Sequence, residues 1–328
     1  MWKSSTRLAM VGFLAALASG KLVYAAHAEP RPISELKPIA TIQIGKTADW
    51  VAITVDAVWV GSTGPNAIHR IDPATNREAA SVSVSGEPCA GLAPGFGSLW
   101  VPLCAAKPAL ARIDLHSNLV TAVLKFGTAA ECGITASGDS VWLVVDGHGT
   151  LARIDPVSNT IRQRVKLPPG SCNPHYSRGM VWVTNAKGAE LTAVDARTGA
   201  IVSTIQTGPY PRFLTDAAGS IWTLNQGDGS LTQVDMPTRR VTGSVALGTP
   251  GHGGDIAFGG LMVWTTMMGV PLTAVEPTSN TVFRQWRGPG GDSLAIGHGA
   301  IWLTDYHKGT IVRLSLAEAT SPFCCLRN

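Results

Sequence analysis

Gly219-Ser220-Ile221-Trp222-Thr223-Leu224-Asn225, followed by a loop and then by Leu231-Thr232-Gln233-Val234-Asp235, is a stretch that recurs in altered form along the whole chain. Seven tryptophans each follow a small turn and a β-branched or leucine residue: Trp59, Trp100, Trp142, Trp182, Trp222, Trp264 and Trp302. The steps between them are 41, 42, 40, 40, 42 and 38 residues. A fixed period of about forty residues indicates a repeat architecture.

A second landmark follows each tryptophan by 12 to 14 residues: Asp72, Asp114, Asp155, Asp195, Asp235, Glu276 and Ser315. The copy around Trp222 contains four short β-rich runs separated by Gly, Asp, Asn and Pro clusters, which is typical of a four-stranded meander. One such sheet cannot bury both of its faces, whereas seven stacked radially can. We therefore predict an all-β fold, a seven-bladed β-propeller of four-stranded blades. A solenoid of stacked hairpins is the alternative.

The last copy ends after its third run, at residues 311–316, and the missing fourth run lies at the other end of the chain. The segment Ile39-Ala40-Thr41-Ile42-Gln43-Ile44-Gly45 is similar to the runs that end other repeats. We expect residues 38–45 to pair with residues 311–316 and close the ring, because this pairing removes two open sheet edges. Closure favours the ring over the solenoid.

The first 28 residues have the pattern of a secretory signal. Lys3 and Arg7 precede a short apolar run, and Ala26-His27-Ala28 fits a small-x-small cleavage site. An uncleaved anchor is the alternative, although Lys21 interrupts the run. We predict a signal peptide at 1–28, a mobile lead-in at 29–37, the propeller at 38–316 and a tail at 317–328. The mature protein is then periplasmic or secreted, without a membrane span, and we expect a monomer.

Charge excludes one class of partner. The net charge of +4 includes Lys3, Arg7 and Lys21 of the signal, so the mature chain is close to neutral and has no basic run. A protein that binds nucleic acid through its phosphates carries a basic face or stripe. We therefore expect no nucleic acid partner.

Six cysteines in an exported chain indicate at least one disulfide. Cys89 and Cys104 flank the turn Gly95-Phe96-Gly97-Ser98 symmetrically, so a simple hairpin centred there places them opposite each other, with Cβ atoms about 4.5–5.5 Å apart. Cys132 and Cys172 each stand ten residues before a tryptophan, at equivalent places on neighbouring blades. They either form a bridge or remain thiols. Cys324 and Cys325 receive no assignment.

Chemistry is expected at the channel mouth, the face on which the innermost strands begin and side chains from all blades converge. Ionisable and polar residues are more frequent there than elsewhere in this weakly charged chain. We predict catalytic roles for Asp292, His252, Arg212 and Tyr306, and substrate contacts from Gln226, Asn225, Asp49, Trp50 and His307. Asp255 and Asp292 are candidate ligands for a divalent cation, Mg²⁺ or Ca²⁺. The alternative is that these side chains bond to backbone amides of the glycine-rich loops. We expect His175 to be a packed core histidine.

The repeat resembles the virginiamycin B lyase family and the related YVTN (YncE-type) bacterial propellers. The resemblance is carried by Gly97-Ser98-Leu99-Trp100-Val101, by the stretch around Trp222 and by Leu151-Ala152-Arg153-Ile154-Asp155-Pro156, and it covers about residues 38–316. It implies a seven-bladed propeller. The lyases of the family open a cyclic depsipeptide by elimination with magnesium, using histidines at the start of the last two innermost strands and a glutamate after the last second strand. Here those places hold Gly254 or Asp255, Asp292 and Tyr306.

Two functions follow as expectations. The first is a lyase or ring-opening enzyme that acts on a small ester, lactone or ether at the mouth. Its base would come from Asp292, Asp255 or His252, and Arg212 would stabilise the anion. The alternative is a non-catalytic propeller that presents its mouth to a small-molecule ligand or to another envelope protein.

Overall fold

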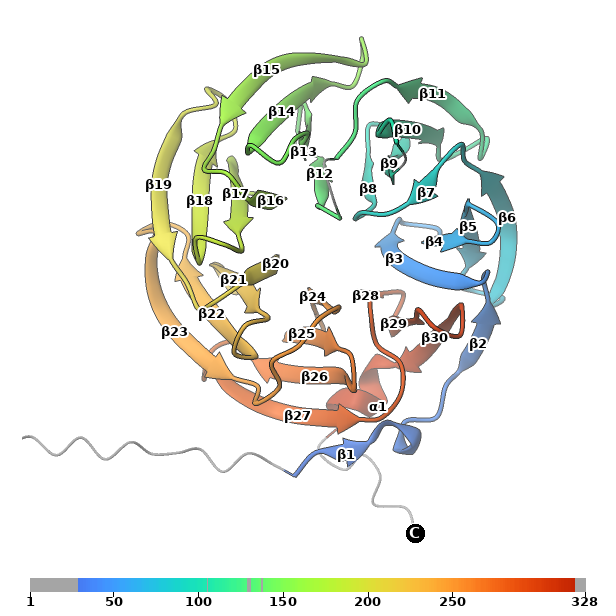
Figure 1. Ribbon diagram of the computed structural model, residues 1–328. Helices are drawn as coiled ribbons and strands as arrows, with labels where there is room; N and C mark the ends of the chain where they lie inside the picture. Colours follow the sequence, from blue (N-terminus) through green and yellow to red (C-terminus); the bar gives the residue numbers. More distant parts are fainter. Residues whose placement is uncertain (1–28, 105, 129–130, 137, 322–328) are drawn as a thin grey trace, which may run out of the picture.

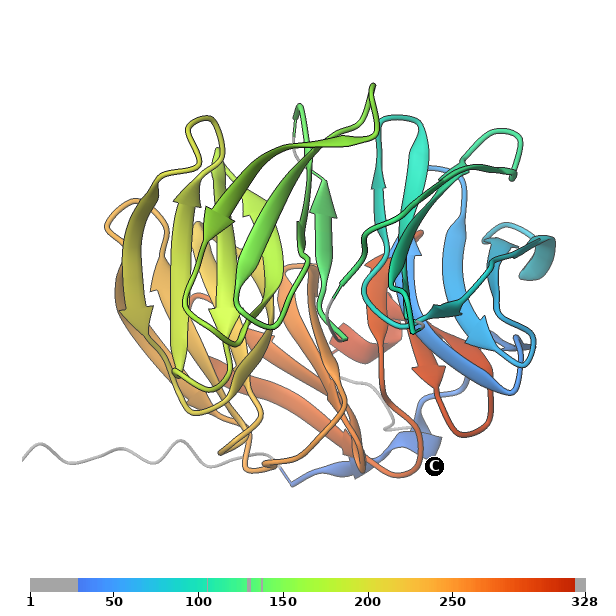
Figure 2. The ribbon, with the colours of Figure 1, turned by 45° about the horizontal axis from the view of Figure 1, so that its top comes forward.

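The computed structural model describes residues 29–104, 106–128, 131–136 and 138–321. Within these residues the chain forms seven sheets arranged radially around a central channel, and their strands are antiparallel except for one short added strand (Figures 1 and 2). The predicted seven-bladed β-propeller of four-stranded blades is confirmed. The predicted signal peptide, the end of the tail, and Cys324 and Cys325 lie outside the described residues.

Each blade runs from an innermost strand at the channel to an outermost strand at the rim. The innermost strands are β3 (Thr47–Ile53), β7 (Glu87–Pro88) with β8 (Ala93–Gly95), β12 (Ile134–Ala136), β16 (Ser171–Ser177), β20 (Pro211–Ala217), β24 (Asp255–Gly259) and β28 (Leu294–Gly297). The second strands are β4 (Val58–Thr63), β9 (Ser98–Cys104), β13 (Val141–Val144), β17 (Met180–Asn185), β21 (Ser220–Asn225), β25 (Met262–Met267) and β29 (Ala300–Asp305). The third strands are β5 (Ala67–Asp72), β10 (Ala109–Asp114), β14 (Thr150–Asp155), β18 (Glu190–Asp195), β22 (Ser230–Asp235), β26 (Val270–Glu276) and β30 (Thr310–Ser315). The outermost strands are β6 (Arg77–Ser83), β11 (Val120–Leu124), β15 (Thr160–Lys166), β19 (Ile201–Gln206), β23 (Arg240–Ala246), β27 (Thr281–Arg287) and β2 (Ala40–Gln43).

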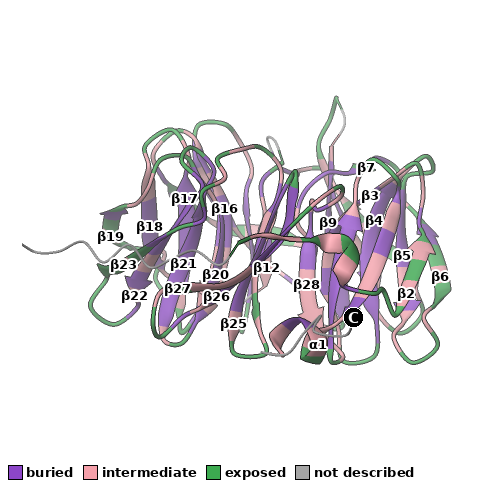
Figure 3. Ribbon diagram, turned by 90° about the horizontal axis from the view of Figure 1, so that it is seen from below, coloured by how far each residue is buried: buried purple, intermediate pink, exposed green. Residues whose placement is uncertain are grey.

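The seven repeated tryptophans all lie on second strands and are fully buried. A large aromatic ring fills the wedge-shaped space between two diverging sheets, where it buries much apolar surface. In Figure 3 the inner parts of the blades are buried, whereas the rim strands carry the exposed residues. The core therefore lies between blades, and each blade is stabilised by its neighbours.

In four repeats an Arg-Ile-Asp or Arg-Leu-Ser triplet ends at the second landmark, and the arginines of these triplets have a packing role. Arg70, Arg112, Arg153 and Arg313 lie over the rings of Trp59, Trp100, Trp142 and Trp302, with the guanidinium carbon 4.8–5.8 Å from the ring centroid. The triplet aspartate accepts bonds from the following turn, as Asp114 does from Ser117 N at 2.7 Å. Both landmarks of the repeat are thus explained by the packing and turns of the blade.

The ring closes as predicted. Strand β2 pairs antiparallel with β30, with Ala40 opposite Arg313 and Gln43 opposite Thr310. Figure 1 shows the N-terminal strand completing the blade that contains the C-terminal strands. The last blade therefore has its full set of four strands.

The lead-in segment is docked, which corrects the expectation that it is mobile. Strand β1 (Arg31–Pro32) pairs in parallel with β27 at the rim of the sixth blade, and a 3-10 turn follows at Ile33–Glu35. Leu36 is 3% exposed and packs in the cluster that contains Trp264 and Trp286. The segment is fixed because its apolar side chains fill the outer end of this blade's core. At the other end of the chain, the short helix α1 (Leu316–Thr320) buries Ala319 in the same cluster.

A disulfide joins Cys89 and Cys104, as predicted, with Cα atoms 5.6 Å apart. The predicted register is wrong, because Glu87 and not Cys89 is opposite Cys104. Gly95 pairs with Ser98 next to the turn, but an irregular segment between β8 and β7 shifts the pairing further along. The bridge therefore fastens a bulged innermost segment to its second strand.

No helix among the described residues is long and apolar enough to cross a membrane.

Candidate functional site

The mouth contains a cavity of about 230 Å³ at the ends where the innermost strands begin. Its lining residues come from five blades: Asp49, Trp50, Glu131, Arg212, Phe213, His252, Gly253, Gly254, Met268, Asp292, Ser293 and Tyr306. A neighbouring cavity of about 290 Å³ shares Met268, Asp292 and Tyr306 with it and includes His307. The structure therefore brings together most of the residues predicted for the site.

Two carboxyl groups of the mouth form a pair. Asp49 begins the first blade and Asp292 the seventh, and the carboxyl of Asp49 donates a hydrogen bond to the Asp292 carboxylate. Burial, and next to it the Asp292 charge, raises the pKa of Asp49 well above its ordinary value. Burial also raises the pKa of Asp292, against the opposing effect of the Gly254 N–H, which lies 3.3 Å from its Oδ1. Ionisation of either carboxyl group therefore disfavours ionisation of the other, and both pKa values are raised.

Asp255 lies on a further cavity of about 360 Å³ in the central channel, the channel cavity, although its charge and those of the pair still act on each other. It lines the channel cavity and not the mouth cavity, and its Oδ2 accepts the Ser293 hydroxyl at 2.8 Å. Its Oδ1 accepts the N–H of Ile256 at 2.8 Å. Burial raises the pKa of Asp255 to about 6, although these hydrogen bonds favour the charged form. Asp255 is therefore a carboxyl group of the channel.

Arg212 is paired across the mouth. Its Nη2 lies 2.8 Å from Oε2 of Glu131, which stands on the third blade, whereas Arg212 begins the fifth. The same nitrogen also donates to the carbonyl oxygen of Glu131 at 3.3 Å. Glu131 was not among the predicted site residues, although it stands at the start of its blade, which is the positional signal that could have found it. The positive charge of Arg212 is already balanced in this structure.

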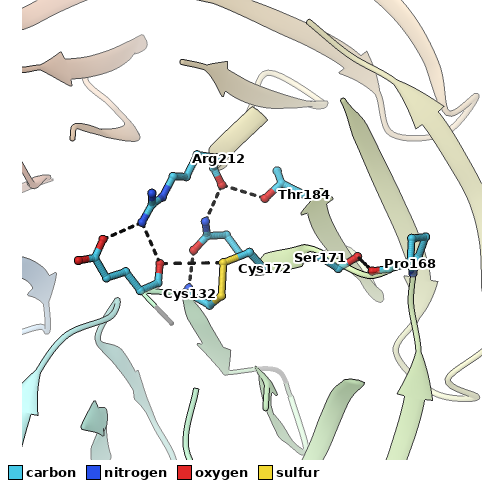
Figure 4. The surroundings of a disulfide bond; sticks show 9 residues. Cys132, Pro168, Ser171, Cys172, Thr184 and Arg212 are labelled. Atoms are coloured by element: carbon cyan, nitrogen blue, oxygen red, sulfur yellow. Dashed lines mark hydrogen bonds and ion pairs between the residues drawn. A yellow bond between two sulfur atoms is a disulfide. The ribbon is translucent and has the colours of Figure 1, made fainter. Parts of the chain in front are cut away.

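The backbone of Arg212 is held by buried side chains from the fourth blade (Figure 4). Asn173 Nδ2 and Thr184 Oγ1 donate to the Arg212 carbonyl oxygen at 2.7 and 2.8 Å. The amide oxygen of Asn173 accepts the N–H of Gly133, so Asn173 connects three successive blades. A disulfide between Cys132 and Cys172 lies beside it, with Cα atoms 4.9 Å apart, which settles the alternative left open for these cysteines. Arg212 and Glu131 thus project from a rigid edge of the mouth.

Glycines shape the loops that carry the acidic residues. Gly254 has φ +98°, and a Cβ there would lie 2.1 Å from the carbonyl oxygen of Thr266. Gly291 has φ +86°, and its Cβ would meet the Cα of Pro271 at 2.4 Å. Only glycine combines this backbone conformation with such close approach. These two glycines directly precede Asp255 and Asp292, so they fix the backbone conformation from which the two acidic residues follow.

Two predicted contact residues have a different role. Asn225 is fully buried, and its amide binds Ser230 and Thr232 at 3.0 and 2.9 Å. Gln226 is 3% exposed and donates to the carbonyl oxygen of Gly253 at 2.6 Å. Neither residue lines the mouth cavity. Gln226 agrees with the alternative that polar residues here bond to the glycine-rich backbone, whereas Asn225 bonds to side chains of its own blade.

The histidines considered in the sequence differ in where their side chains lie. His252 is exposed on the wall of the mouth, and His307 is exposed with its ring edge-on to Tyr306 at 5.6 Å. Burial, and then the neighbouring acidic groups, raises the pKa of Tyr306, so this phenol stays protonated. His175 is not a packed core histidine. It faces the channel cavity, and its Nε2 lies 2.8 Å from Asp216.

The described residues do not fit the expected cation at Asp255 and Asp292. Among them, no three His, Cys, Asp or Glu side chains gather as a metal-binding group. The two carboxyl groups also line different cavities, and both already accept hydrogen bonds. We therefore derive no chemical step through a metal.

No protein-family model matches the chain, and neither does any curated protein. Two solved structures are similar in fold. BamB from Moraxella catarrhalis is 10% identical with a TM-score of 0.60, and the match covers 86% of this chain and 100% of that one. The computationally designed Ika8 protein is 13% identical with a TM-score of 0.64, and the match covers 82% of this chain and 83% of that one. At such identities the likeness defines the class of protein, a β-propeller, and nothing finer.

Proposed function

We propose that this protein is an exported propeller whose mouth binds a small ester, lactone or ether and opens it by acid–base chemistry. The observation that carries the proposal is the Asp49–Asp292 pair, two carboxyl groups with raised pKa values that line the mouth cavity together and that, in this proposal, share one proton. The resemblance of the repeat to the virginiamycin B lyase family supports a lyase. The two disulfides support export, since such bonds persist in oxidising compartments.

The chemistry follows from the two states of the pair. The Asp292 carboxylate accepts a proton from the carbon next to a substrate carbonyl. The electron pair of that C–H bond forms a double bond to the adjacent carbon, and the ring C–O bond on this adjacent carbon breaks. The protonated Asp49 gives its proton to the leaving oxygen, so the pair ends with its single proton moved from one carboxyl to the other. Tyr306 stays protonated and donates a hydrogen bond to the developing anion. Arg212 would assist only where the substrate displaces Glu131.

A panel of small esters, lactones and cyclic ethers incubated with the purified mature protein tests the proposal by mass spectrometry. Elimination opens a lactone without changing its mass, whereas hydrolysis adds one water. Asp292→Asn is expected to lower turnover by about 10²-fold or more, the usual contribution of a positioned acid–base group. Asp228→Asn is the matched control, because Asp228 is an exposed residue of a loop of the fifth blade that lines neither mouth cavity. Equal turnover in Asp292→Asn and wild type contradicts the proposal.

The second candidate is a non-catalytic propeller that binds a small ligand or an envelope protein at the mouth. The Arg212–Glu131 pair favours it, because a cation already neutralised at 2.8 Å gives little stabilisation to a reaction anion. Ligand binding that depends on Asp292, with no product formed from any member of the panel, would select this candidate.

A further inference from the structure

Two aromatic side chains meet across the channel. Trp50 lies on β3 of the first blade and Phe213 on β20 of the fifth, and their ring centroids are 6.2 Å apart, with planes tilted by 56°. The first and fifth blades are not neighbours in the ring (Figure 1). Each side chain is nevertheless only 8% exposed. They are buried against each other and against the channel wall, not between adjacent sheets.

The same two residues border two cavities. Trp50, Phe213 and Ser293 line both the mouth cavity and a channel cavity of about 360 Å³. The walls of the channel cavity are mixed, with apolar side chains such as Leu92, Ile134 and Leu214 beside the polar His175 and Asp255. The rings of Trp50 and Phe213 therefore stand at the boundary between the two spaces.

The backbone of Trp50 is unusual for such a residue. Its φ is +56°, in the left-handed region that bulky residues rarely occupy. Its N–H donates to Oδ1 of Asp49 at 2.7 Å, so this conformation also positions the carboxyl pair. Strained conformations of this kind persist where the surrounding structure requires them, frequently at functional sites.

The Phe213 side is held as firmly. The guanidinium carbon of Arg212 lies 5.4 Å from the Phe213 ring centroid, and Glu131 fixes that guanidinium from the third blade. Three blades thus contribute to one aromatic contact. Because residues of three blades hold the two rings, we expect Trp50 and Phe213 to remain in contact.

We infer that Trp50 and Phe213 form a partition across the central channel, and that Trp50 thereby limits the length of any ligand bound at the mouth. The inference deepens the proposed function and rests on the mouth as the place where the ligand's head group is held. Ligands in wild type are confined to the space above the indole. Removing the indole joins the mouth to the channel cavity, where Leu92, Ile134 and Leu214 offer apolar contacts.

A series of linear alkylamines from propylamine to octylamine, titrated by calorimetry, tests this partition. The ammonium head is attracted by the Asp292 carboxylate, and the chain points toward the partition. In wild type we expect affinity to stop rising once the chain reaches the indole. In Trp50→Gly each further methylene enters the channel among Leu92, Ile134 and Leu214 and is expected to raise affinity by about fourfold.

Tyr210→Gly is the matched control. Tyr210 has the same φ of +56° at the start of the fifth blade, but it is 44% exposed and lines neither of these cavities. We expect it to follow wild type. Phe213→Ala provides a second opening of the partition and is expected to behave as Trp50→Gly, so the test survives the misfolding of either variant.

The inference is overturned if octylamine binds Trp50→Gly and Phe213→Ala no more tightly than wild type, including the case in which it binds none of them. Failure of the proposed function gives a different result. In that case Asp292→Asn leaves the turnover of the panel unchanged, whatever the dependence of amine affinity on chain length.

Discussion

Asp255 makes the stability of this protein depend on pH in an uncommon direction. Burial raises its pKa in the folded state to about 6, against 3.8 for an ordinary aspartate. The folded state therefore holds the proton more tightly than the unfolded chain does. Protonated Asp255 therefore adds to the free energy of unfolding. This contribution is complete below the pKa that Asp255 has in the unfolded chain, and it is lost as pH rises through about 6. At about 1.36 kcal/mol for each pKa unit, the loss from this group is at most about 3 kcal/mol.

Asp255→Asn removes this titration. The amide keeps the shape of the carboxyl group, so it can still accept from Ile256 N and bond to the Ser293 hydroxyl. We expect the free energy of unfolding of the variant, relative to wild type, to increase by about 2–3 kcal/mol between about pH 4 and pH 7.5. Urea unfolding followed by circular dichroism, with the disulfides intact, measures the difference at each pH.

Asp235→Asn is the control for this experiment. Hydrogen bonds from Thr238 lower the pKa of Asp235, so its contribution is lost only as pH falls toward the acid end. The difference between that variant and wild type should change little above about pH 5. A constant difference between Asp255→Asn and wild type across the whole range would refute the assignment of a raised pKa to Asp255.

Three further results are expected. Deleting residues 29–45 removes β1, β2 and Leu36, so the protein should unfold or aggregate; a folded deletion variant with an unchanged melting temperature would show that ring closure is dispensable. Replacing Cys89 and Cys104 together by serine should cost about 3 kcal/mol, because the bridge closes a loop of 15 residues, and an unchanged urea midpoint would contradict this. EDTA should leave the melting temperature of the purified protein unchanged, since the described residues gather no metal-binding group; a decrease that Mg²⁺ or Ca²⁺ reverses would argue for a bound cation.

The sequence by itself determined the number of blades, the strand that carries each tryptophan and the strand that closes the ring. These features repeat at a fixed period, and each is a local property: a turn, a buried ring on the second strand, a capped turn after the third. Local patterns of this kind predict the structure well because every copy of the repeat occupies the same environment in its blade. The closing strand could be predicted because it supplies the fourth strand that the last copy of the repeat lacks.

The contents of the mouth were predicted in part. Position relative to the tryptophan places Asp49, Arg212, His252, Asp292 and Tyr306 on one face, and the structure puts all five in the lining of one cavity. The same argument places Asn225 and Gln226 on this face, but neither lines that cavity, because position along a strand does not determine where a side chain points. Their amides turn into the loops, where buried hydrogen-bonding groups would otherwise lack partners.

Only the tertiary structure decided which side chains meet across the ring. Arg212 with Glu131 and Trp50 with Phe213 join blades that are not neighbours, and Asp49 with Asp292 joins the first and seventh blades, which become neighbours only when the ring closes. A period in the sequence records the geometry within a blade and toward the next one, but it does not record the width of the channel or the reach of a particular side chain across it. The raised pKa values of the carboxyl pair and the contact between Trp50 and Phe213 arise from that closure, because they depend on distances that exist only once all seven blades have packed into a ring.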